Sequence, residues 1–349
     1  MLTSINMKLK SNLHFIELEK IINSIRGMNF ESLIIIIDLN LHSQYFKKMD
    51  FDSLGKKVII WKAPPGENCK NFKEFETCLE FLLEKGVHRN SHLLAIGGGA
   101  LSDYAGFIAS TLLRGISWSI IPTSLLSMID ASIGGKVAIN SISGKNLIGS
   151  FHNPDNIYID DKFIATLPVD EFQSGLGELA KYGILSKDIK KLILGGADIC
   201  KIIQACAKFK QDITTKDLKE SGERKILNLG HTIGHALEYI YQIKHGIAVF
   251  WGMIFIFIIF QKKRELDELI AIKRSLGIKE TEPPWLNKTI PIADLMRFIT
   301  KDKKTIKNNT LEVILPGMKN QVTIKEVSLM ELETKIVNSE AEVKKFVIS

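Results

Sequence analysis

The chain has 349 residues, of which 45% are hydrophobic, so it can bury a large core in one or two domains. Its formal net charge is +7, and its lysines and arginines are spread along the chain rather than gathered in a basic stripe. This distribution argues against a nucleic-acid partner and favours a small anionic ligand.

The cysteines and the apolar runs favour a cytoplasmic protein. The four cysteines (Cys69, Cys78, Cys200 and Cys206) form no C-x-x-C pair, which is typical of a reduced, cytoplasmic protein. The N-terminal stretch MLTSINMKLKSNLHF lacks the apolar core of a signal peptide. The most apolar run, residues 247–260, is shorter than the ~18–20 residues that span a bilayer, so it predicts a buried core helix and no membrane contact.

Strand and helix signals alternate in the first part of the chain. Four apolar runs predict strands: 33–38, 57–61, 92–99 and 117–124. Residues 72–86 place apolar side chains at helical spacing and end in Gly86, a predicted helix stop. The alternation predicts a parallel sheet covered on both faces, with ligands at the carboxyl ends of its strands.

The pattern changes after about Asp161, and helical periods dominate through Leu276. We therefore expect an α/β domain over residues 1–160 and a mainly helical domain over residues 161–349. The last stretch, EAEVKKFVIS, is compatible with either a helix or a frayed tail.

Two glycine-rich stretches are candidates for binding anions. In GGGALSDYAGF the spacing is not G-x-G-x-x-G, so nucleotide binding and a simple tight turn both remain open. Asp38, at a strand end, is suited either to a ribose hydroxyl or to capping a turn. Between Asp130 and Pro154, Lys136 and Lys145 lie beside glycines. We interpret this second stretch as an anion site, the alternative being surface lysines in flexible turns.

Two clusters carry further chemistry. Glu178 and Lys181 lie three apart on a predicted helix, among apolar neighbours that favour a partly buried pair over an exposed one worth ~0.2–0.5 kcal/mol. In LNLGHTIGHAL, His231 and His235 fall on one helical face, and His245 follows closely. Spacing alone favours zinc held by His231, His235 and one carboxylate. A lone histidine, by contrast, is usually structural.

The chain resembles the 3-dehydroquinate synthase family in segments that occur in this order: PGENCK, GGGALSDYAGF, RGISWSIIPTSLLSMIDASIGGK, GKNLIGSF, TLPVDEFQSGLGELAKYG, ESGERKILNLGHTIGHALE, HGIAVFWGM and DKK. The resemblance implies a Rossmann-like N-terminal domain that binds NAD and a mostly helical C-terminal domain that binds a divalent metal, zinc or else cobalt. It also implies a cytoplasmic homodimer.

The implied activity is that of a carbon–oxygen lyase of the shikimate pathway. Its substrate would be the anionic sugar phosphate 3-deoxy-D-arabino-heptulosonate 7-phosphate, and its products 3-dehydroquinate and phosphate. The steps would be transient oxidation by NAD, phosphate elimination, reduction, ring opening and aldol closure, with NAD regenerated. Related cyclases that make valiolone or deoxy-inosose skeletons, polyol dehydrogenases and a non-catalytic paralogue are the alternatives.

The resemblance also implies roles for individual residues. The metal ligands would be Glu178, His231 and His245, so His235 would contact the substrate instead. The other substrate contacts would be Asp130, Lys136, Lys145, Asn146, Lys181, Lys210, Arg224, Asn228 and one or both of Lys303 and Lys304. Arg114 would reach the phosphate of the partner subunit's substrate. NAD contacts would be Asp38, Glu67, Lys70, Gly98, Gly99, Ala100, Leu101, Ser102, Asp103, Thr123, Ser124 and Thr166, with Lys136 and Lys145 shared between both sets.

The sequence departs from the family pattern at Pro65, Val137, Asp170 and Ile247, and it reads Ile129-Asp130-Ala131-Ser132 where the family usually has VDSS. Ile247 stands where the family usually has a glutamate two residues after His245. If that glutamate supports the metal ligand, metal affinity would drop ~10–100-fold. None of these departures removes a proposed metal ligand or substrate lysine, so we expect a divergent but active member.

Overall fold

The computed structural model describes residues 10–45, 51–279, 282–286, 288, 290–301, 306–307, 309–317 and 322–348. Its internal contacts divide the chain into two compact units. The first unit is Met1–Leu167 with Ala207–Lys219, and the second is Pro168–Cys206 with Glu220–Ser349. Helix α7 (Ile199–Lys216) therefore contributes to both units.

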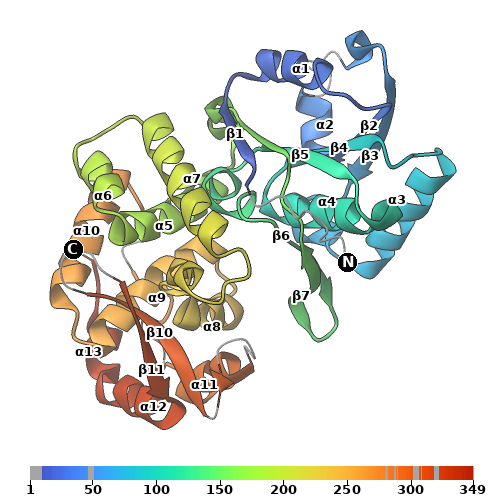
Figure 1. Ribbon diagram of the computed structural model, residues 1–349. Helices are drawn as coiled ribbons and strands as arrows, with labels where there is room; N and C mark the ends of the chain where they lie inside the picture. The colour runs from blue at the N-terminus through green and yellow to red at the C-terminus, as the bar shows by residue number, and fades with distance from the viewer. Residues whose placement is uncertain are drawn as a thin grey trace. The chain divides into compact units, whose positions relative to one another are not determined.

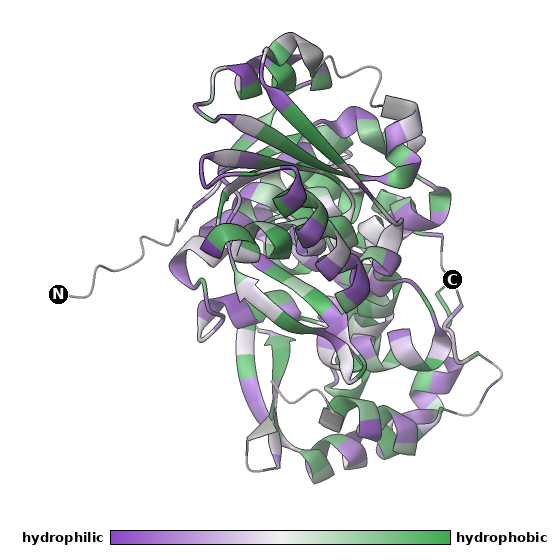
Figure 2. Cartoon of the chain, turned by 90° about the vertical axis from the view of Figure 1, so that its right-hand side faces the viewer, coloured by the Kyte–Doolittle hydropathy of each residue, from purple (hydrophilic) through white to green (hydrophobic). Residues whose placement is uncertain are grey.

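The first unit is built on a six-stranded parallel sheet (Figure 1). In spatial order its strands are β1 (Asn12–Phe15), β8 (Asn156–Ile159), β5 (Ser117–Pro122), β4 (Ser91–Gly97), β2 (Ser32–Asp38) and β3 (Lys57–Ala63). The four predicted strands and their parallel arrangement are confirmed. Residues 33–37 of β2 are completely buried, as expected for a parallel strand covered on both faces, and Figure 2 shows hydrophobic colour along these strands.

Helices of the first unit follow the strands. They are α1 (Leu18–Arg26), α2 (Leu39–Tyr45), α3 (Phe72–Glu84) and α4 (Gly99–Thr111), with the short helices η2 (Asp52–Leu54), η3 (Gly66–Cys69), η4 (Leu112–Arg114), η5 (Ser127–Ala131) and η6 (Asp161–Thr166). The predicted helix over 72–86 is confirmed. The Asn71 side chain caps its start by accepting from Glu74 N, and Gly86 follows its end with a φ of 69°.

The glycine- and lysine-containing stretch from Asp130 to Pro154 is regular in structure, unlike the flexible turns that were the alternative to an anion site. It forms an antiparallel hairpin of β6 (Lys136–Ser141) and β7 (Gly144–Phe151). Val137 and Ile139 are buried, and Val137 lies against Gly106 of α4. Burial of these β-branched side chains explains the regular structure.

The second unit is mostly helical, as expected. Its helices are α5 (Val169–Leu185), α6 (Lys187–Leu194), η7 (Glu223–Asn228), α8 (His231–Tyr241), α9 (His245–Ile259), α10 (Lys263–Leu276), α11 (Ile292–Lys301), α12 (Leu329–Asn338) and α13 (Glu340–Lys345). Helix α13 resolves the open question about the last stretch. The sequence patterns did not predict the antiparallel sheet of β9 (Ile306–Lys307), β10 (Thr310–Pro316) and β11 (Val322–Ser328).

Helix α9 is the core of the second unit. All its residues from Gly246 to Ile259 are buried, which confirms the predicted core helix. It packs against α5, α8 and α10, and Trp285 makes edge-to-face contacts with Trp251 and Phe255. Among the helices in the described part of the chain, none is long and apolar enough to cross a membrane.

Glycines allow α9 to touch α5 directly, backbone against backbone. A Cβ atom on Gly246 would lie 1.8 Å from Ser174 O, and one on Gly177 would lie 2.2 Å from Gly246 O. The Ser174 hydroxyl also accepts a hydrogen bond of 3.1 Å from Gly246 N. No side chain fits between these two backbones.

Similar contacts join α9 to α8. A Cβ atom on Gly252 would lie 2.2 Å from Gly230 O, and one on Gly234 would lie 3.0 Å from Ala248 O. We call the five residues Gly177, Gly230, Gly234, Gly246 and Gly252 the glycine contacts. They set the distances between α9 and its two neighbours.

Replacing Gly246 by alanine tests the glycine contacts. The added methyl group would overlap Ser174 O, so we expect Gly246→Ala to destabilise the protein by ~1–3 kcal/mol or more. Gly27→Ala is the control, because Gly27 has φ −73° and its nearest atom would be 3.6 Å from the new Cβ. Thermal unfolding of both variants is the measurement. Equal midpoints would contradict the close contact.

Candidate functional site

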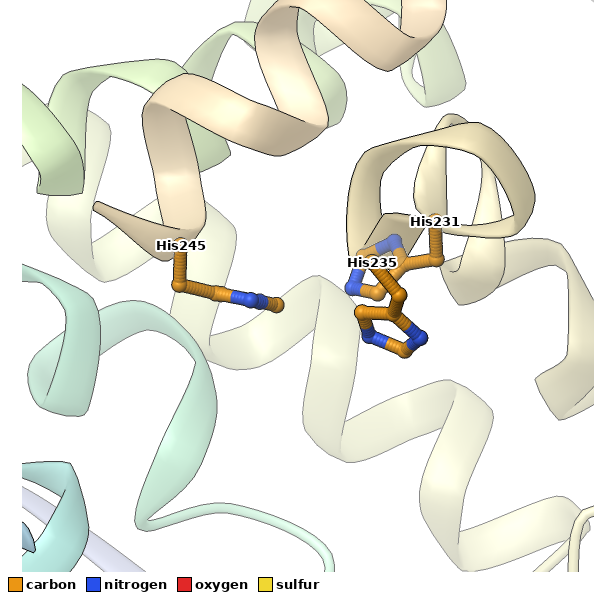
Figure 3. Close-up of side chains that lie close together, drawn as sticks. All are labelled: His231, His235 and His245. Carbon is orange, nitrogen blue, oxygen red and sulfur yellow. The ribbon is translucent and has the colours of Figure 1, made fainter. Parts of the chain in front are cut away.

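Three histidines gather at the start of two helices of the second unit. His231 and His235 lie one turn apart on α8, as predicted, and His245 is the first residue of α9. Each offers one ring nitrogen such that the three atoms lie within 4.8 Å of one another. Figure 3 shows the three rings facing a common space. The group is therefore a candidate metal site.

Glu178 of α5 lies beside these histidines. Its side chain is 0% exposed, and its Oε2 is 2.6 Å from Nζ of Lys181, which is 1% exposed. The pair expected to be partly buried is thus wholly buried. Glu178 Oε1 lies 3.4 Å from His231 Nε2 and 3.2 Å from His245 Nε2, yet receives no hydrogen bond from the described residues. A buried acceptor in this state fits a cation bound between the three side chains.

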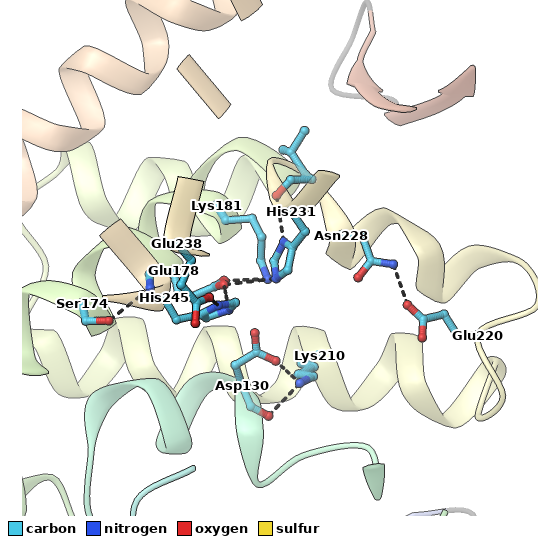
Figure 4. Close-up of polar contacts among 12 residues, drawn as sticks. Asp130, Ser174, Glu178, Lys181, Lys210, Glu220, Asn228, His231, Glu238 and His245 are labelled. Atoms are coloured by element: carbon cyan, nitrogen blue, oxygen red, sulfur yellow. Dashed lines mark hydrogen bonds and ion pairs between the residues drawn. The ribbon is translucent and has the colours of Figure 1, made fainter. Parts of the chain in front are cut away.

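The other ring nitrogens of two histidines face acceptors (Figure 4). His231 Nδ1 is 3.2 Å from Leu229 O, and His245 Nδ1 is 2.9 Å from Glu238 Oε2. With a hydrogen on each Nδ1, the Nε2 lone pairs point towards Glu178. One carboxylate oxygen and two imidazole nitrogens are a common ligand set of catalytic zinc. His235 is more exposed and offers the alternative third nitrogen.

Charges in this cluster favour cation binding. Burial disfavours the charged form of Glu178, but Lys181, His231 and His245 outweigh it, and the pKa of Glu178 lies well below its usual value. Burial also lowers the pKa of His231 well below its ordinary value, although Glu178 opposes this. For His245, the nearby carboxylates of Glu178 and Glu238 outweigh burial and raise the pKa to about 9. The metal-free site thus has an ionised carboxylate, a neutral His231 and a protonated His245.

In the first unit, the strand order reverses between β2 and β4, the usual place for a nucleotide in such sheets. The carboxyl ends there bring together Asp38, Gly98 and Thr123. Gly98 precedes α4, whose first turns contain residues 99–103, and Thr123 N donates to Gly97 O at 3.0 Å. A helix N-terminus after a glycine turn can receive a pyrophosphate. Asp38 Oδ1 accepts from Asn40 N at 2.9 Å, so in this structure it caps a turn.

Lys70, whose side chain is buried, lies at the centre of a polar network in the first unit. Its Nζ is 2.7 Å from Asp103 Oδ2, 2.5 Å from Asn146 Oδ1 and 3.9 Å from Glu67 Oε1. Burial raises the pKa of Asp103, although the Lys70 charge opposes this. The structure therefore brings together four of the predicted residues from separate segments, and Lys70 is already charge-paired.

The remaining predicted residues take varied positions. Lys210 Nζ donates to Asp130 O at 2.7 Å and contacts Asp130 Oδ1. The residues Lys136, Lys145 and Arg114 are exposed, whereas Arg224 is buried.

Three further predicted residues make hydrogen bonds within the protein. Asn228 donates to Glu220 Oε1 at 2.6 Å. Ser124 Oγ accepts from Ser127 N, and Thr166 Oγ1 donates to Phe163 O. Lys303 and Lys304 lie outside the described residues.

Sequence reasoning missed Glu238, which contacts His245. The signal was present, because Glu238 follows His231 by seven residues and His235 by three, which places all three on one face of α8. The contact itself could not be predicted, because it depends on where α9 places His245.

Comparison with known proteins gives consistent matches. Residues 60–174 match the family model described as 3-dehydroquinate synthase N-terminal, and residues 175–305 match 3-dehydroquinate synthase C-terminal. A 3-dehydroquinate synthase of Staphylococcus aureus (strain Newman) is 35% identical over 325 residues, which cover 87% of this chain and 88% of that protein.

Solved structures share the fold. A 2-deoxy-scyllo-inosose synthase complexed with carbaglucose-6-phosphate, NAD+ and Co2+ superposes with a TM-score of 0.77 at 24% identity, covering 94% of this chain and 96% of its own. A 2-epi-5-epi-valiolone synthase from Streptomyces hygroscopicus subsp. jinggangensis 5008, with NAD+ and Zn2+ bound, gives 0.76 at 22% identity, covering 90% and 92%.

Zinc binding should release a proton from His245. With a pKa of about 9 this residue is protonated at pH 7.5, and Nε2 must lose its proton to bind a metal. Glu178 is already ionised and His231 already neutral, so we expect about one proton released at pH 7.5 and fewer as the pH rises through about 9. Calorimetric titration in buffers of different ionisation enthalpy measures this number. Heats at pH 7.5 that do not depend on the buffer would contradict it.

Proposed function

The chain belongs to the 3-dehydroquinate synthase family, and we propose that it binds its metal through Glu178, His231 and His245 and NAD at the carboxyl ends of β2, β4 and β5. Its activity is to convert 3-deoxy-D-arabino-heptulosonate 7-phosphate to 3-dehydroquinate and phosphate in the shikimate pathway. The observation that carries the metal assignment is the position of Glu178 Oε1, buried and facing Nε2 of both histidines.

The metal, zinc or else cobalt, would supply a Lewis acid that polarises the hydroxyl group oxidised by NAD. Lys181 keeps Glu178 ionised and fixes its orientation at 2.6 Å. His231 is held neutral by burial and is therefore ready to donate a lone pair. Because these groups are rigidly packed before substrate arrives, little reorganisation is needed when charge develops.

We propose that NAD lies at the end of the sheet where α4 begins. The helix N-terminus after Gly98 would face the pyrophosphate, and Asp38 would exchange its turn cap for a ribose hydroxyl. The Lys70 network would border this site and hold the hairpin β6–β7 against η3. NAD is regenerated in each turnover, so it should remain bound.

The substrate carries a carboxylate and a phosphate, and we propose that cationic and amide side chains bind them. These are Lys136, Lys145, Asn146, Lys181, Lys210, Arg224, Asn228 and His235, with one or both of Lys303 and Lys304, while Asp130 orients Lys210. Fixed cations of this kind bind phosphate and carboxylate oxygens strongly in sites that exclude water.

Further proposals concern organisation. Residues 1–160 would form the NAD-binding domain and residues 161–349 the metal- and substrate-binding domain. The protein would be a cytoplasmic homodimer in which Arg114 reaches the substrate of the partner subunit. In support of this role, Leu113 and Arg114 have φ values of 53° and 69°, a backbone conformation that costs energy and is retained most often at functional sites.

Turnover tests the activity. Purified protein with the heptulosonate phosphate, trace NAD and zinc should release phosphate and dehydroquinate in equal amounts, without accumulating NADH. A chelator should abolish both products and added zinc restore them. Accumulation of NADH with a polyol would point to a dehydrogenase. Conversion of another sugar phosphate, but not this one, would point to a related cyclase.

Metal content tests the ligand set. Glu178→Gln and His245→Ala should lose bound zinc, whereas His235→Ala should retain it and lose turnover, because His235 is assigned to the substrate. Zinc per chain after dialysis is the measurement, and His42→Ala, at an unrelated histidine of α2, is the control. Zinc lost from His235→Ala but retained by Glu178→Gln would establish the three-histidine set instead.

A further inference from the structure

We propose that Glu238 is a positioning residue for the metal site: it holds the His245 imidazole so that Nε2 faces the metal position. This inference rests on the proposed assignment of His245 as a metal ligand. Glu238 itself belongs to neither of the two candidate ligand sets.

Carboxylates from two different helices face the two nitrogens of the His245 ring. Its Nδ1 is 2.9 Å from Oε2 of Glu238 on α8, and its Nε2 is 3.2 Å from Oε1 of Glu178 on α5. Rotation of the imidazole about its side-chain bonds would break the Glu238 contact. This contact therefore selects the ring orientation in which Nε2 meets Glu178.

The His231 ring is oriented by a different kind of acceptor. Its Nδ1 faces Leu229 O, a backbone carbonyl only two residues earlier in the chain. His245 has Gly246 and Ile247 after it, and neither has a side-chain acceptor. The acceptor comes instead from the last turns of α8. Glu238 Oε2 thus faces Nδ1 of His245 in the same way that Leu229 O faces Nδ1 of His231.

This arrangement has a chemical consequence. A metal-bound histidine that donates its second N–H to a carboxylate is a more basic ligand with a fixed tautomer, and loss of such a partner typically costs 10–100-fold in metal affinity. The Glu238 side chain is 21% exposed, so its truncation should not leave a large cavity. Its effect should therefore appear in metal binding more than in stability.

The experiment measures zinc affinity of the full-length protein by competition with a chromophoric chelator, and the visible spectrum of the Co2+-loaded protein. We expect Glu238→Ala to bind zinc ~10–100-fold more weakly and to change the Co2+ absorption bands. Glu238→Gln keeps a side-chain oxygen that can accept from Nδ1–H, so it should recover much of the affinity.

Lys244→Met is the matched control at the same junction. Lys244 precedes His245 and pairs with Asp170 and Glu171, but it is 47% exposed, so we expect wild-type affinity for zinc. Wild-type affinity and spectrum in Glu238→Ala, or equal losses in the Ala and Gln variants, would overturn the proposal. A wild-type protein that binds no zinc would instead overturn the metal site itself.

Discussion

Backbone contact between α9 and its neighbours α5 and α8 is the constraint on which the candidate metal site depends. Each proposed ligand directly adjoins one of the glycine contacts: Glu178 follows Gly177, His231 follows Gly230 and His245 precedes Gly246. Because no side chain fits between these backbones, the three helices have little freedom to slide. The ligand geometry is therefore set by main-chain packing, and the buried side chains of α9 hold that packing together.

Much of the fold followed from local pattern. Parallel strands such as β2 are continuous apolar runs, and α9 is apolar on every side, so both are visible in the sequence. Strand β11 was missed because four consecutive residues, 323–326, are exposed and only Val327 is buried. The hairpin β6–β7 was missed because its lysines and the glycines beside them suggest an anion-binding loop, whereas burial against α4 decides its structure.

The candidate site was predictable only in part. Helical spacing places His231 and His235 on one face. Without the family resemblance, this spacing favoured these two histidines as ligands of one ion. The approach of Glu178 and His245 depends on how α5 and α9 pack, which no local pattern contains; the family resemblance supplied that set. Likewise Lys70 finds its partners Asp103 and Asn146 at separations of 33 and 76 residues, so its charge pairing was not visible beforehand.

The division of the chain into units has a consequence for its synthesis. The first unit includes Ala207–Lys219, and within it Lys210 contacts Asp130 and Gln211 donates to Ser11 O at 2.7 Å. A ribosome that has just translated Leu167 has therefore not yet made all of this unit. Residues 207–219 of α7 can join the first unit only after residues 168–206 of the second unit have been synthesised.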